Sequence, residues 1–165
     1  MKVPYLYAIL IIFFLSSQAL DAYESKSNGV KFIAGAAAFL DEETPLDHFV
    51  IGAAGVIGLT PRLRIEPQFL YMNGPDSDRD ITITGNLLYD MWFTQKSALY
   101  VVVGGGLLRH TQDFAVVGPF SSYDGTFSGG VGMRFDVSEK FYVAPEFRVG
   151  WDPLYQIAGM AGFKF

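Results

Sequence analysis

The chain has 165 residues, which is enough for one ordinary domain and too few for two. It contains no cysteine, so disulfides and thiolate metal sites are excluded, and a net charge of −5 argues against nucleic-acid binding. Half of the residues are hydrophobic, and 18 glycines accompany an aromatic content of 16%, an unusual pairing for a soluble protein.

The N-terminal segment has the organisation of a signal peptide. Met1 and Lys2 supply a positive end, Tyr5–Leu15 is an apolar run, and small residues follow. The apolar run is shorter than the roughly 20 residues that a spanning helix needs, which disfavours an uncleaved anchor. We therefore expect a signal peptide over 1–22, cleaved after Ala19 or Ala22, and an exported domain over 23–165.

From Val30 onward, hydrophobic residues recur with a period of two, which is typical of β-strands. No useful stretch has the period of a helix. Turn-forming clusters separate eight such segments, and we predict strands over Val30–Phe39, Phe49–Leu59, Leu63–Met72, Asp80–Asp90, Ala98–Arg109, Tyr123–Phe135, Phe141–Trp151 and Tyr155–Phe165.

The segment Phe141–Trp151 shows the two faces of these strands. Its odd-numbered positions are all apolar, whereas Glu146 and Arg148 share the even-numbered face, and Pro145 lies in the middle. In five of the eight segments the apolar face carries no charge at all. The polar face is dominated by Gly, Ala, Ser and Thr, which makes it a poor surface to present to water.

Two architectures fit eight alternating strands: a soluble barrel of the lipocalin type and a membrane barrel. The segments have the length of membrane-crossing strands, about 9 to 11 residues, and exceed the soluble average of about 5 to 6. Aromatic residues of the apolar face gather near the segment ends, as at a membrane interface. The prediction is an all-β, eight-stranded antiparallel up-and-down transmembrane β-barrel. These aromatic residues are Tyr71, Tyr89, Phe135, Phe141, Trp151, Tyr155, Phe163 and Phe165.

The connections between the segments differ in length and charge. Those at Thr60–Arg62, Met91–Ser97 and Asp136–Lys140 are compact, whereas His110–Ser122 is predicted to be the longest loop. The connections after the first and third segments are acidic, which suggests either a solvated rim or loose divalent-cation binding. Their spacing matches no EF-hand, so no metal site and no cofactor are predicted.

The chain resembles the small outer-membrane barrels of the outer-membrane-protein-A-like and opacity-protein type. The resemblance lies in the turn and alternating strand of Gly58–Tyr71 and in the terminal strand Tyr155–Phe165. It implies the bacterial outer membrane, with short turns in the periplasm and longer loops outside. It also implies insertion by the outer-membrane assembly machinery, which reads the terminal strand ending in Phe165. We further expect a monomer surrounded by outer-membrane lipids and lipopolysaccharide, without nucleic acid.

Side chains nearly fill the interior of an eight-stranded barrel, so a plugged lumen is expected. Strands three and seven lie opposite each other in such a ring, and we expect Arg64, Glu66, Glu146 and Arg148 to form one central charge cluster. Further charged or polar side chains are predicted to point inward. They are Lys31, Gln68, Asn86, Asp90, Arg109, Asp124, Arg134 and Lys164.

Two prolines, Pro67 and Pro145, stand at matching places in the third and seventh segments. Each removes a backbone donor that hydrocarbon cannot replace. We expect bulges there that shape the barrel, and the alternative is a seam for lateral lipid entry.

A structural or surface-interaction role without catalysis is the leading interpretation. One alternative is a narrow, porin-like pore for ions or small solutes. Another is a lipid-modifying enzyme that transfers or removes acyl chains of lipid A. His110, Asp113, Ser121 and Ser122 are weak catalytic candidates for it, because they lie together in the longest predicted loop.

Overall fold

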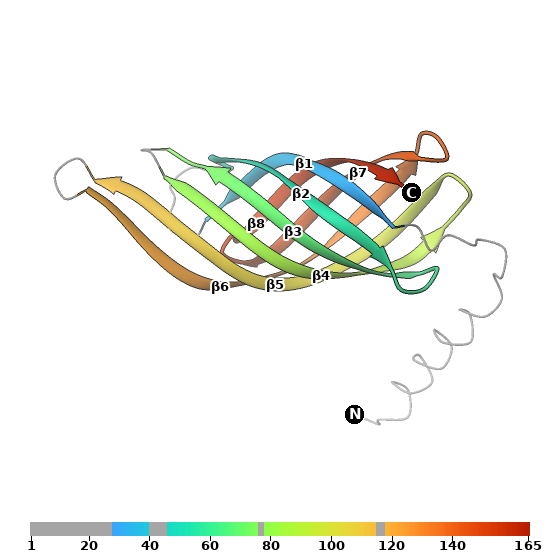
Figure 1. The fold of residues 1–165 in the computed structure, drawn as a ribbon, viewed down its shortest axis with the longest axis horizontal. Helices are drawn as coiled ribbons and strands as arrows, with labels where there is room; N and C mark the ends of the chain where they lie inside the picture. Colours follow the sequence, from blue (N-terminus) through green and yellow to red (C-terminus); the bar gives the residue numbers. More distant parts are fainter. Residues whose placement is uncertain (1–27, 40–45, 76–77, 115–117) are drawn as a thin grey trace, which may run out of the picture.

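The computed structural model describes residues 28–39, 46–75, 78–114 and 118–165, which form an eight-stranded antiparallel barrel (Figure 1). The expected signal peptide, residues 1–22, lies outside this described part. The strands are β1 (Gly29–Ala38), β2 (His48–Gly58), β3 (Leu63–Asn73), β4 (Arg79–Phe93), β5 (Ser97–Phe114), β6 (Gly118–Asp136), β7 (Phe141–Trp151) and β8 (Tyr155–Lys164).

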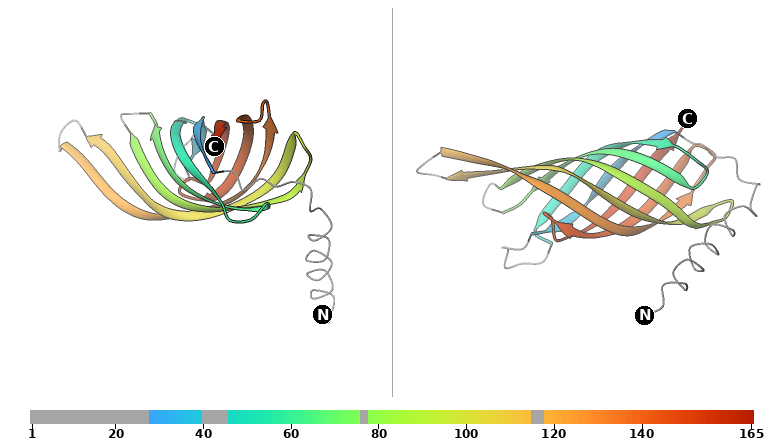
Figure 2. Two further views of the ribbon diagram at one scale, coloured as in Figure 1. Left: turned by 45° about the vertical axis from the view of Figure 1, so that its right-hand side comes forward. Right: turned by 90° about the horizontal axis from the view of Figure 1, so that it is seen from below.

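Each strand pairs with its neighbours in sequence, and β1 pairs with β8 to close the barrel. The closing ladder runs without interruption from Gly29 opposite Lys164 to Ala38 opposite Tyr155. The strands are inclined to the long axis of the barrel (Figure 2). Closure gives every strand of the barrel wall a neighbour on both sides, which is the condition for a β-sheet to cross hydrocarbon. The predicted fold class is confirmed.

The hairpin of β5 and β6 is longer than predicted. The expected loop at His110–Ser122 is mostly strand, since β5 continues to Phe114 and β6 starts at Gly118. The two strands stay paired beyond the barrel wall and project past the other strands (Figure 1). Serine and threonine in this stretch suggested a loop, but a projecting ribbon tolerates polar residues because both of its faces meet solvent.

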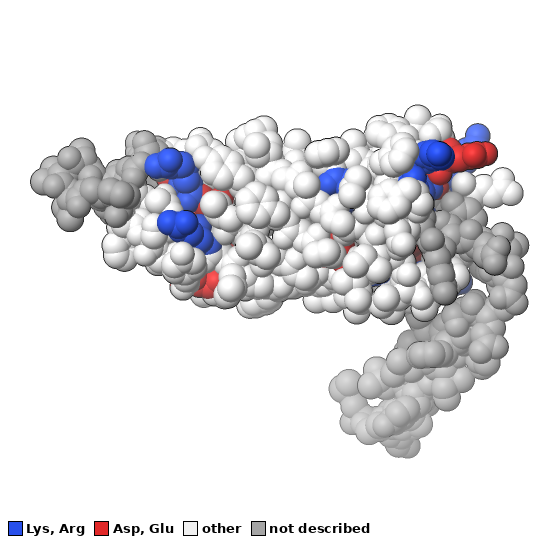
Figure 3. Space-filling model, viewed as in Figure 1, with Lys and Arg blue, Asp and Glu red and all other residues white. Residues whose placement is uncertain are grey.

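The outer wall of the barrel is an apolar belt. Phe32 on β1 is 68% exposed and Phe127 on β6 is 64% exposed, and every strand contributes similar residues. Most of the charged side chains seen on the visible face gather toward the two ends of the molecule, and its middle is largely white, with few charged atoms showing (Figure 3). A continuous apolar belt of this kind is the lipid face of a membrane barrel. Separately, the part of the chain that the structure describes has no helix with the length and hydropathy needed to cross a membrane.

Neither strand proline forms the expected bulge. The β2–β3 register is the same on both sides of Pro67, and the β6–β7 register is the same on both sides of Pro145. Among the described strands the register shifts between Asp90 and Trp92 of β4 instead. Each proline interrupts the ladder with one neighbouring strand only. Pairing with the other neighbouring strand continues, with Pro67 opposite Gly85 and Pro145 opposite Gly159, and keeps the strand in register.

Candidate functional site in the lumen and at its mouth

Strand pleating sends one set of side chains from every strand into the lumen. Within the barrel wall, and before the register shift after Asp90 in β4, the odd-numbered residues of β1 and the even-numbered residues of β2 to β8 face the lumen. Charged and amide side chains therefore share the lumen with apolar ones. Because a buried charge without a partner is costly, the contacts among these groups determine what the lumen can do.

One group of charges centres on Glu66 and Glu146. Glu66 lies 2.7 Å from the Lys31 ammonium and 3.8 Å from the Arg148 guanidinium. Arg148 Nε donates to Glu146 Oε1 at 2.6 Å, and the Tyr100 hydroxyl donates to the other Glu146 oxygen at 2.8 Å. Three of the four residues expected to meet across the lumen are thus in contact.

The fourth, Arg64, belongs to a second group nearer the short-turn end. Arg64 pairs with Asp90, and its guanidinium lies over the Tyr100 ring. Asp90 lies 3.8 Å from Arg134 Nη1. Lys164 Nζ forms an ion pair with Asp136 at 2.8 Å. The expected single cluster is therefore two linked groups. Asp90 lies on β4, the strand that pairs with the strand of Arg64. It is therefore closer to Arg64 than the residues on the far wall of the barrel are.

A polar layer and then an apolar layer lie between these charges and the long-loop end. Arg148 donates to Asn86 Oδ1 at 2.9 Å, and Asn86 donates to Gln68 Oε1 at 3.3 Å. Beyond this amide pair the lumen narrows to apolar side chains that are at most 4% exposed. They are Val50, Leu70, Met72 and Leu108.

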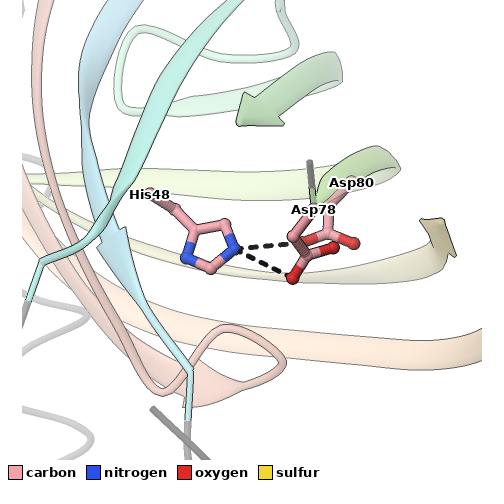
Figure 4. A group of neighbouring side chains, drawn as sticks. All are labelled: His48, Asp78 and Asp80. Atoms are coloured by element: carbon pink, nitrogen blue, oxygen red, sulfur yellow. Dashed lines mark hydrogen bonds and ion pairs between the residues drawn. The ribbon is translucent and has the colours of Figure 1, made fainter. Parts of the chain in front are cut away.

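A second polar cluster lies at the mouth, beyond the apolar layer. The mouth cluster consists of His48, Asp78 and Asp80, which Figure 4 shows, together with His110, and Asp47 lies beside it. His48 Nδ1 lies 2.8 Å from Asp47 Oδ1, whereas His48 Nε2 lies 3.4 Å from Asp78 Oδ2 and 3.7 Å from Asp80 Oδ2. His110 Nδ1 lies 2.7 Å from Asp80 Oδ1. His48, Asp78 and Asp80 are all at most 5% exposed.

The strand ends position this cluster. His48 is the first residue of β2, and Asp80, near the start of β4, lies opposite His110 of β5 in the ladder. The Phe39 ring lies 4.6 Å from the His48 imidazole, measured between centroids. A Cβ atom at Gly74 would collide with the same imidazole, so only glycine admits the ring there. Sequence reasoning missed the cluster because its members come from three separate segments. The available signal was that each occupies an inward position at a strand end.

Two of the side chains predicted to point inward do not lie in the lumen. Arg109 is exposed on the outer side, because the inward residues of β5 are its even-numbered neighbours Leu108 and His110. Asp124 is exposed as well, since it lies in the projecting part of β6, where it accepts a hydrogen bond from Ser122.

Of the four weak catalytic candidates, His110, Ser121 and Ser122 have side chains in the described part of the structure, and Asp113 does not. The described carboxylate partners of His110 are Asp80 and Asp78, at 2.7 Å and 3.3 Å from its Nδ1. The Ser121 hydroxyl lies 3.2 Å from that of Thr111, and Ser122 donates to Asp124 at 3.4 Å. Ser122 stands opposite His110 in the ladder, but no hydrogen bond between their side chains is seen.

No protein-family model and no curated protein sequence matches the chain. Solved structures do. The N-terminal barrel of Pseudomonas aeruginosa OprF has a TM-score of 0.64 at 12% identity, covering 86% of this chain and 98% of that one. Neisserial surface protein A has a TM-score of 0.66 at 16% identity, with coverages of 86% and 98%. Ail of Yersinia pestis has a TM-score of 0.53 at 11% identity, with coverages of 84% and 97%. The chain thus has the fold of the small eight-stranded outer-membrane barrels.

Proposed function

We propose that this chain is an integral barrel of the bacterial outer membrane whose lumen is closed and whose long-loop end interacts with other surfaces. The apolar belt and the fold support the location. The proposal includes export by a signal peptide over 1–22 and insertion by the assembly machinery through the strand that ends in Phe165. It also includes an orientation with the short turns in the periplasm.

The burial of the inward side chains is the observation that supports the proposed non-conducting role. Val50 and Met72 are fully buried in the apolar layer, and Glu66 and Glu146 are at most 4% exposed within the charge network. Paired charges and close-packed apolar groups leave an ion no hydrated route along the axis.

The projecting β5–β6 hairpin supports the interaction role. It presents Phe120 and Tyr123, which are 61% and 70% exposed, and the Arg109 guanidinium lies 5.9 Å from the centre of the Tyr123 ring. Exposed aromatic residues with an adjacent arginine are typical of the centres of protein interfaces. Two proteins of the same fold are named for such roles, a neisserial surface protein and an attachment invasion locus protein.

Single-cysteine labelling tests location and orientation together, because the natural chain has no cysteine. Ser121→Cys on the hairpin should react with a membrane-impermeant maleimide on intact cells. Glu139→Cys, in the turn between β6 and β7, should react only after the outer membrane is broken. Equal labelling of both variants on intact cells would contradict the proposed orientation.

Planar-bilayer recording tests the closed lumen. Purified barrel whose unheated form migrates differently from its boiled form should give no resolved single-channel steps, whereas a porin in the same bilayer should. Reproducible steps from the folded chain would favour the pore instead.

Mass spectrometry of lipid A with and without the protein tests the lipid-modifying alternative. It should show no difference, since no serine is hydrogen-bonded to His110 among the described residues. A modification that His110→Ala abolishes would establish the enzyme.

A further inference from the structure

We propose that the mouth cluster is a binding site for a first-row divalent transition-metal cation, with Zn²⁺ as the reference ion. His48 Nε2 and one carboxylate oxygen each from Asp78 and Asp80 would be its ligands. His110 would act as a positioning residue that orients the two carboxylates. The site goes beyond the proposed surface role and does not depend on it.

The spacing of the donor atoms fits a small cation. The three ligand atoms all lie within 4.8 Å of one another, and His48 Nε2 lies 3.4 Å from Asp78 Oδ2 and 3.7 Å from Asp80 Oδ2. Ligands at about 2.0 Å in a tetrahedral Zn²⁺ site are about 3.3 Å apart. The cluster therefore needs only small side-chain shifts to close on a metal, and the three side chains point toward a common centre (Figure 4).

Asp47 holds the imidazole of His48 in the orientation that a ligand needs. His48 Nδ1 lies 2.8 Å from Asp47 Oδ1, the shortest contact of the ring. The opposite nitrogen, Nε2, therefore points at the carboxylates of Asp78 and Asp80. A carboxylate behind a ligating histidine is the usual support of a metal site.

The two aspartates also have unused acceptor capacity directed at the cluster. Both residues are more than nine-tenths buried, and among the described residues Asp78 Oδ1 and Asp80 Oδ2 accept no hydrogen bond of good geometry. The neighbouring ring nitrogens are His110 Nδ1 at 3.3 Å from Asp78 Oδ1 and His48 Nε2 at 3.7 Å from Asp80 Oδ2. Buried carboxylate oxygens without a hydrogen-bond donor are rare, because desolvation penalises them heavily. A bound cation would give both carboxylates a closer partner.

The donor set selects the class of metal. One imidazole nitrogen with two carboxylate oxygens suits Zn²⁺ and its first-row neighbours, whereas Ca²⁺ takes 6 to 8 oxygen ligands. Three protein ligands leave one coordination position for water or for a group on another molecule. The ion would enter from the long-loop end, since Val50, Leu70, Met72 and Leu108 close the lumen below it.

A metal-free ion-pair network is the competing interpretation. A doubly protonated His48 would donate to Asp47 from one nitrogen and to Asp78 and Asp80 from the other, satisfying the same atoms. The two interpretations differ in whether the folded barrel takes up zinc.

The test is isothermal titration calorimetry of the full chain, folded in detergent and freed of metal with a chelator, against ZnCl₂. We expect one Zn²⁺ ion per chain and no comparable heat with CaCl₂. Asp80→Asn keeps the size of the side chain but removes its charge, and it should weaken binding by at least about tenfold, as should Asp78→Asn. His110→Gln should weaken binding while leaving the visible spectrum of bound Co²⁺ tetrahedral in type, since it alters position and not ligation.

Asp124→Asn is the matched control, because Asp124 is an exposed carboxylate on the projecting hairpin, outside the cluster. It should bind Zn²⁺ like the natural chain. Each variant is checked for the folded gel mobility. A second measurement needs no variant: Zn²⁺ should raise the urea midpoint of the natural chain, because a ligand of the folded state stabilises it. Absence of zinc uptake and of a midpoint shift, or equal affinities for Asp80→Asn and Asp124→Asn, would overturn the proposal.

Discussion

Arg148 is the residue on which the lumen charge network depends most. Its guanidinium contacts Glu146, Glu66 and Asn86, and the side chain is 4% exposed. Burying a pair of charges is close to neutral for stability, whereas removing one partner strands the other in a medium that cannot solvate it. The network therefore contributes more to a unique lumen arrangement than to net stability.

Arg148→Met tests this at the residue scale. We expect it to lower the free energy of unfolding by about 3 kcal/mol, because among the described residues Glu146 then keeps the hydrogen bond from the Tyr100 hydroxyl and Glu66 keeps the ion pair with Lys31, but both lose the guanidinium. Urea unfolding in lipid vesicles, followed by Trp92 and Trp151 fluorescence, gives the value. Arg109→Met is the control, and an exposed arginine should change the free energy by less than about 0.5 kcal/mol. Equal changes in the free energy of unfolding for the two variants would show that the buried contacts of Arg148 contribute no more to stability than an exposed arginine does.

Glycines on β6 and β8 make room for two tyrosine side chains that lie in the lumen. Gly132 lies opposite Tyr100 in the β5–β6 ladder, and a Cβ on Gly132 would collide with the Tyr100 ring. Gly162 of β8 stands in the same relation to Tyr142 of β7. Each tyrosine thus folds over a glycine on the next strand and brings its hydroxyl into the lumen. Glycine is required at these two positions because the tyrosine ring comes too close for a side chain, and not because the backbone needs a conformation that glycine favours.

Gly132→Ala is the corresponding prediction at the scale of the element. The added methyl group should displace Tyr100 from Glu146 and destabilise the barrel by about 1 to 3 kcal/mol through overpacking. Gly125→Ala on the same strand is the control, because nothing lies within 4 Å of a Cβ there. The two variants are compared by urea unfolding in the same vesicles. A loss from Gly125→Ala as large as that from Gly132→Ala would contradict this account.

Shallow apolar grooves mark the outer wall at the two strand prolines. One is lined by Pro145, Gly159 and Phe32, and the other by Pro67, Gly55 and Phe32. Pro67 lies opposite Gly85 of β4 and lacks the ladder pair with Gly55 of β2, whereas Pro145 lies opposite Gly159 of β8. These are the places where the wall departs from a smooth, fully paired cylinder.

At the scale of the whole molecule, the apolar belt defines how the barrel sits in the bilayer. Val131 of β6 lies opposite Phe147, near the middle of β7, and is 48% exposed, whereas Val137, in the turn after β6, is 65% exposed. In water these two positions would be equivalent surface sites. In a bilayer, Val131 faces hydrocarbon and Val137 lies at the edge.

Val131→Arg should therefore destabilise the barrel in lipid vesicles by about 2 to 4 kcal/mol, and Val137→Arg by about 0 to 1 kcal/mol. The measurement is again the urea midpoint in vesicles, with the folded gel mobility confirming insertion before denaturant is added. Equal effects of the two arginines would contradict the assignment of the belt to lipid.

The sequence by itself determined the barrel. Period-two alternation assigned the inward face correctly in the third, fourth, sixth, seventh and eighth segments, even for the charged pair of Glu146 and Arg148, because pleating leaves only two choices per strand and hydrocarbon rejects one of them. Predictions from residue type were less reliable where hydrocarbon does not require one face of the strand to be apolar. The serines near the tip of the β5–β6 hairpin suggested a loop, and Arg109 was assigned to the wrong side.

Only the tertiary structure decided which inward groups meet. Arg64 pairs with Asp90 and not with the far wall, and His48, Asp78, Asp80 and His110 come together from three segments at one mouth. The alternation assigns each side chain to a face but not to a level along the barrel axis. That level follows from how each strand is staggered against the next around the closed ring, which pleating alone does not set.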